Sequence, residues 1–192
     1  MVIELDPVDR ITAGAVGPPG QRAFFLQGRQ SDRLVTVLVE KQQVELLSSS
    51  LVEILARAGK ETGQGPPEEE MDLEEPVLPE WRAGRLSIGY DEGRDLVLLE
   101  CEEYVPGTDD EDEEDEDQEG GDQIGDPIPP PPQGEPGRIR FWTTREQALA
   151  LARHGAAVAA AGRPRCELCG NPRDPEGHIC PALNGHRGAE AR

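Results

Sequence analysis

The residues best suited to chemistry in this sequence are three cysteines and a histidine in its last thirty residues. Cys166 and Cys169 are separated by two residues and followed by a glycine, which is the Cys-x-x-Cys-Gly pattern of a zinc knuckle. Two thiolates at this spacing can bind one ion, and the glycine lets the backbone curl around the sulfurs. His178 and Cys180 supply a second pair of ligands. The spacing therefore predicts one zinc ion in a tetrahedral site.

The fourth ligand has an alternative, because His186 is also close enough in the sequence to reach the ion. A site in which protein ligands fill all four positions leaves no place for a substrate water, which favours a structural ion over a catalytic one. Two other interpretations stay open at this point. The cysteines can be thiols without a metal, or Cys166 and Cys169 can carry out redox chemistry.

Elsewhere the sequence offers no group of residues that amounts to an active site. Three glycines at three-residue spacing, within residues 14–20, resemble a phosphate-binding loop, but they lack a Walker lysine and enclose two prolines, so we expect a hairpin turn. Cys101 is expected to be a thiol of the core. An enzyme assembled from scattered residues on a sheet is the rival interpretation. The residues that it would use are His154, otherwise expected to be a surface or packing residue, Asp91, Tyr90 and Trp142.

The charge is distributed unevenly along the chain. The net charge is −20, yet residues 61–80 contain eight acids and residues 106–135 contain thirteen, with no Lys or Arg in either segment. The rest of the chain is close to neutral. We therefore expect a folded domain with two flexible acidic inserts, at 61–80 and 106–137. Acidic runs repel phosphate backbones, so nucleic-acid binding is not expected, although an Arg-rich C-terminal part keeps it as the last alternative.

The expected location is the cytoplasm. The first residues lack the basic start and apolar core of a secretory signal. No apolar run approaches the roughly 20 residues that cross a bilayer, so no membrane association is expected. Four cysteines, three of them clustered, fit metal binding in a reducing compartment better than a disulfide framework. The expected partner is another protein.

The hydrophobic pattern predicts an α+β fold. Its element order is three strands and a helix, and then the same again, which predicts a possibly duplicated βββα unit forming one antiparallel sheet with both helices on one face. Thr144 and Gln147 fit a capping box at the start of the second helix. Residues 1–162 are expected to form this domain, and residues 163–192 a zinc-knuckle-like tail. The predicted strands are 11–16, 22–27, 34–40, 82–90, 95–105 and 138–143, and the predicted helices are 41–58 and 144–161.

Three stretches of the sequence resemble a known family. They are Phe24-Phe-Leu-Gln27 after Gly17-Pro-Pro-Gly-Gln21, Gly89-Tyr90-Asp91, and above all residues 163–185 around the cysteines. Together they resemble the actinobacterial family called domain of unknown function 3090, over nearly the whole chain. The family has no established activity, so the resemblance implies no function. Its members have a tyrosine where this chain has His186, which favours His178 as the fourth ligand.

Overall fold

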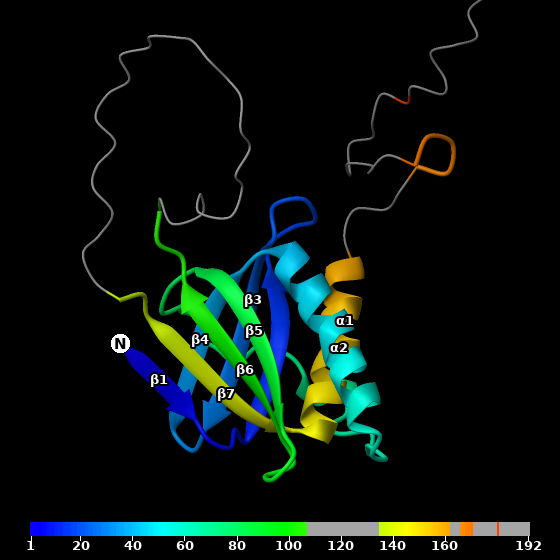
Figure 1. Cartoon of the computed structure of the whole chain (residues 1–192). Coiled ribbons are helices and arrows are strands. Elements are labelled where there is room, and N and C mark those ends of the chain that lie inside the picture. Colours follow the sequence, from blue (N-terminus) through cyan, green and yellow to red (C-terminus); the bar gives the residue numbers. More distant parts are fainter. Residues whose placement is uncertain (107–134, 162–165, 171–179, 181–192) are drawn as a thin grey trace, which may run out of the picture.

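The computed structural model describes residues 1–106, 135–161, 166–170 and 180. In these residues the chain forms a mixed α+β domain with two sheets and two α-helices (Figure 1). The elements are β1 (Val2–Leu5), β2 (Arg10–Val16), β3 (Ala23–Gln30), β4 (Arg33–Val39), α1 (Lys41–Ala58), the short 3-10 helix η1 (Glu68–Glu70), β5 (Ala83–Asp91), β6 (Leu96–Glu103), β7 (Arg138–Thr144) and α2 (Arg145–Ala160).

The strands form two sheets, where the sequence predicted one antiparallel sheet. One sheet has the order β1-β7-β6-β5 and the other has the order β2-β3-β4. The sheets stay separate because β4 and β5 meet only near one parallel bridge, Leu38 to Arg82. The additional strand β1 was not predicted, and it pairs parallel to β7. The predicted βββα order occurs twice, as β2-β3-β4-α1 and β5-β6-β7-α2. Its origin by duplication stays a prediction.

The two sheets pack face to face around the main core. Gly28 on β3 faces Phe141 on β7 so closely that a Cβ atom at position 28 would lie 2.5 Å from the Phe141 ring. Phe141 and Leu5 are fully buried in this interface. The helices α1 and α2 lie side by side on one side of the sheets (Figure 1), where α2 contacts β2 and α1 contacts β5. Each helix therefore packs against a strand of the other βββα unit.

Both helices begin where the sequence predicts, and α1 also ends at the predicted glycine. In α1, Gln43 Oε1 accepts a hydrogen bond from Glu40 N at 2.8 Å, and Gly59 ends the helix in the left-handed conformation with a φ of +64°. In α2, Thr144 Oγ1 accepts from Gln147 N at 3.2 Å, while Gln147 Oε1 accepts from Thr144 N at 3.0 Å. The predicted capping box is confirmed. Neither helix in the described part of the chain is long and apolar enough to cross a bilayer.

The first acidic segment, residues 61–80, is bound along β2 and β3, and we call it the acidic strap. Arg10 Nε donates to Glu70 O at 2.8 Å, and Gln27 bonds both the carbonyl and the amide of Glu74, at 3.0 and 2.8 Å. Met71, which belongs to the strap, is fully buried. The expectation of a flexible insert did not account for these contacts. They involve backbone groups of the strap, and amino-acid composition does not reveal hydrogen bonds to the backbone. The second expected insert, 106–137, falls mostly outside the described residues.

Candidate metal centre

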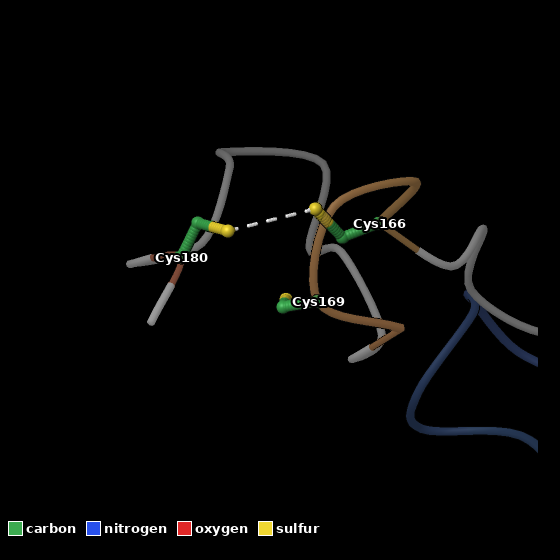
Figure 2. A group of neighbouring side chains, drawn as sticks. All are labelled: Cys166, Cys169 and Cys180. Atoms are coloured by element: carbon green, nitrogen blue, oxygen red, sulfur yellow. Dashed lines mark hydrogen bonds between the residues drawn. The ribbon is translucent and has the colours of Figure 1, made fainter. Parts of the chain in front are cut away.

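Three of the four predicted metal ligands come together in the structure. The sulfur atoms of Cys166, Cys169 and Cys180 all lie within 4.8 Å of one another. Figure 2 shows the side chains of Cys166 and Cys180 pointing toward each other, with 3.8 Å between their sulfurs. Zn–S bonds of about 2.3 Å in a tetrahedron place neighbouring sulfurs about 3.8 Å apart. The spacing thus matches thiolates that share one ion, and it is far longer than a disulfide bond.

The backbone around Cys166 is shaped to hold a thiolate. Gly170 has a φ of +73°, and its N–H donates to Cys166 O at 2.8 Å, which closes the loop on itself. The backbone N–H groups of Cys169 and Leu168 point at the Cys166 sulfur and lower the pKa of that thiol, with Cys169 contributing most. The thiolate is the form that binds metals. The Cys-x-x-Cys-Gly sequence therefore positions a sulfur and also favours its reactive protonation state.

The fourth cysteine of the chain, Cys101, does not belong to this cluster. Cys166 and Cys180 are buried and Cys169 is half-buried, and all four cysteines are present as thiols. Cys101 is completely buried in β6, where desolvation raises the pKa of its thiol. It is a core residue, as the sequence predicted. The two candidates for the fourth ligand, His178 and His186, lie outside the described residues, so the structure does not test either one.

Sequence reasoning missed the polar pair that the buried His154 forms with the exposed Glu68. It lies on α2, it is 7% exposed, and its Nδ1 is 2.5 Å from Glu68 Oε1 on η1. No sequence pattern points to this carboxylate, because 86 positions separate the two residues. The only feature of the sequence that could have indicated burial of His154 is its position on the face of α2 that packs against the core.

The other residues of the rival enzyme interpretation have separate partners and do not converge. Tyr90 donates a hydrogen bond from its hydroxyl to Asp95 in the β5–β6 turn. Trp142 donates from Nε1 to Glu4 at 2.7 Å on the edge strand β1. Asp91 accepts two backbone hydrogen bonds, from Gly93 and Arg94, within its own turn. These contacts hold turns and strands in place, and they bring no nucleophile to a base.

Asp95 is the centre of a charged network that joins three elements. It occupies the left-handed region with a φ of +57°, in the turn between β5 and β6. Its carboxylate accepts from the Tyr90 hydroxyl, from Lys60 Nζ at 2.9 Å and from Arg145 Nε at 3.0 Å. The Tyr90 and Lys60 hydrogen bonds, followed by that of Arg145, hold the pKa of Asp95 well below its usual range. The network links the end of α1 to the start of α2.

Asp95→Asn is expected to lower the free energy of unfolding at pH 7, because asparagine tolerates the left-handed conformation but loses the charge that all three partners contact. Because the pKa of Asp95 is lower in the folded state, its charge stabilises the protein fully at pH values above the pKa of an aspartate in the unfolded chain, about 3.9. This stabilisation is lost as the pH falls toward and through the pKa of Asp95 in the folded state. Urea unfolding should show a difference from wild type that shrinks below about pH 4. Asp32→Asn, in an exposed turn, is the control. An equal loss at pH 7 and pH 3 would contradict the role of the charge.

The fold and the cluster define an α+β protein with a three-cysteine site suited to a metal ion. The chain belongs to the family described as protein of unknown function (DUF3090), whose model matches residues 3–180. The match includes nearly the whole domain and all three clustered cysteines. A comparison with curated proteins finds no match. A comparison with solved structures finds none either.

Proposed function

We propose that this chain is a non-catalytic interaction or adaptor protein of the cytoplasm whose C-terminal tail is held by one structural zinc ion. The observation that carries the proposal is the 3.8 Å between the sulfurs of Cys166 and Cys180, which matches tetrahedral zinc–thiolate geometry. His178 would complete the site. Three soft thiolates with one imidazole suit Zn²⁺ better than Mg²⁺ or Ca²⁺, which prefer oxygen ligands.

A structural role follows from the number of protein ligands. Four protein ligands fill a tetrahedral zinc ion, so no position remains for an activated water. The tail is too short to bury a core of its own, and metal binding is then the source of its folding free energy. A net charge of −20 favours a protein partner with a basic surface.

The metal half of the proposal is tested by elemental analysis of protein purified without added metal. We expect one zinc per chain, and we expect a strong chelator to remove it while the circular dichroism of the α+β domain persists. Protein that contains less than a tenth of a zinc ion per chain, and that takes up none when zinc is supplied, would refute the site.

The adaptor half needs a separate measurement. The tagged full chain, crosslinked in its native cells and purified, should carry one protein partner in a fixed ratio. That complex should weaken as salt rises, because the expected attraction is electrostatic. A chain that elutes alone after crosslinking, under conditions that preserve its zinc, would refute the adaptor role and leave the metal site intact.

A further inference from the structure

A pocket of about 330 Å³ lies between β2, the acidic strap and the C-terminal half of α2. Pockets of this size commonly hold small molecules. None of its lining residues belongs to the cysteine cluster, and the pocket is independent of the zinc proposal. Its apolar wall includes Leu73, Val77 and Val158, while its polar groups are Arg22, Asp72, Glu75 and His154.

The pocket is formed before any ligand arrives, because the strap is fixed against β2. A Cβ atom at Gly14 would lie 2.5 Å from Leu73 Cγ, so only glycine lets the strap approach the strand this closely. Thr12 donates to Met71 O, and Arg10 donates to Asp72 O. These contacts hold Leu73 in the wall of the pocket.

His154 is a buried polar group whose hydrogen-bonding role is set by its partner. Glu68 Oε1 lies 2.5 Å from Nδ1, and a carboxylate accepts hydrogen bonds. In a neutral imidazole with this partner, Nδ1 carries the proton and Nε2 is the acceptor. A buried imidazole held in one tautomer is suited to bind a hydrogen-bond donor.

The charged residues of the lining also favour a donor. Asp72 and Glu75 form no ion pair with any described residue. The one cation of the lining, Arg22, donates from Nη1 to Ala161 O at 2.5 Å, at the end of α2. The lining therefore contains two carboxylates and an imidazole, but only one guanidinium, and that guanidinium already has a carbonyl partner.

An anion is disfavoured in this pocket, although the glycine repeat resembles a phosphate loop. Gly14 is a ladder residue of β2, paired with Phe25 on β3, so it does not lie in a loop that leads into a helix, as a phosphate loop requires. Pro18 and Pro19 contribute no N–H donors to the turn that follows. The carboxylates of Asp72 and Glu75 would repel a phosphate.

We propose that this pocket binds a primary ammonium group carried on a short apolar body. An ammonium has three N–H donors, which suit the acceptors offered by Asp72, Glu75 and His154. The apolar body would contact Leu73 and Val158. The ligand class is therefore a small aliphatic amine.

The test is a titration of the uniformly ¹⁵N-labelled full chain with n-hexylamine hydrochloride, n-hexanol and sodium hexanoate, followed by two-dimensional NMR. We expect saturable shifts with the amine at the amides of Ala15, Leu73 and Val158, and much weaker shifts with the alcohol and the carboxylate. Equal responses to all three compounds, or amine-induced shifts confined to other parts of the chain, would overturn the proposal.

Two conservative variants test the recognition chemistry without disturbing the core. Asp72→Asn and Glu75→Gln should each weaken amine binding roughly threefold, since each removes one charge partner. Glu80→Gln, on the same strap but outside the lining, should leave the affinity unchanged and serves as the matched control. Unchanged affinity in both pocket variants would overturn the assignment of the ammonium to these carboxylates.

Discussion

Replacing Cys166 with serine is expected to weaken zinc binding by roughly a hundredfold or more. Cys166 lies in the Cys-x-x-Cys-Gly segment, where two backbone amides lower the pKa of its thiol and where its sulfur lies 3.8 Å from that of Cys180. A hydroxyl at this position is not ionised near neutral pH and is a poor ligand for zinc. Competition with a chromophoric chelator measures the change in affinity directly.

The matched control is Cys101→Ala, which removes a thiol from β6 and should leave zinc affinity unchanged. The same assay decides the fourth ligand. We expect His178→Ala to lower the affinity and His186→Ala to have no effect. The reverse result would assign the fourth position to His186, and an unchanged affinity in Cys166→Ser would contradict the site itself.

Phe141→Ala is expected to lower the free energy of unfolding by about 4 kcal/mol, because it opens a cavity where the two sheets meet. The Phe141 ring is fully buried, and it packs directly over the backbone of Gly28 on the opposite sheet. Chemical denaturation at neutral pH measures the loss. A loss below about 1 kcal/mol would mean that the interface between the sheets collapses around the missing ring.

Gly28→Ala tests the same contact from the other side. A methyl group there would lie 2.5 Å from the ring of Phe141, so we expect overpacking to cost about 1–3 kcal/mol. Gly89→Ala on β5 is the matched control, since its Cβ would meet nothing closer than 3.8 Å. In a double-mutant cycle, Phe141→Leu should reduce the cost of Gly28→Ala. Additive effects would contradict a direct contact.

The elements of the fold were predictable because their signals are local. The apolar repeat and Gly59 give the bounds of α1 correctly, and the Thr144–Gln147 capping box marks the start of α2. The division into two sheets was not predictable, since it depends on which strands meet in space. β1 is a short strand whose partner β7 lies more than a hundred residues away, and no local pattern encodes that pairing.

The same contrast between local and long-range signals explains why the metal centre was predicted and the polar pairs were not. The three cysteines were found because they are close together in the sequence. The pair of His154 with Glu68 and the network around Asp95 were missed because they join distant parts of the chain. The anchoring of the acidic strap escaped detection because several of its acceptors are backbone carbonyls, which every residue carries.

Because β6 pairs directly with β7, the connection between these two strands is a place where the chain can change in length. The two strands are antiparallel neighbours, and Glu103 and Gly137 exchange backbone and side-chain hydrogen bonds where the strands meet the long connection between them. The entropy of closing such a connection grows only with the logarithm of its length, about 0.6 kcal/mol for each doubling. Evolution can therefore lengthen or shorten this connection at little energetic cost, and an engineer could insert a reporter domain there while the sheet keeps its register.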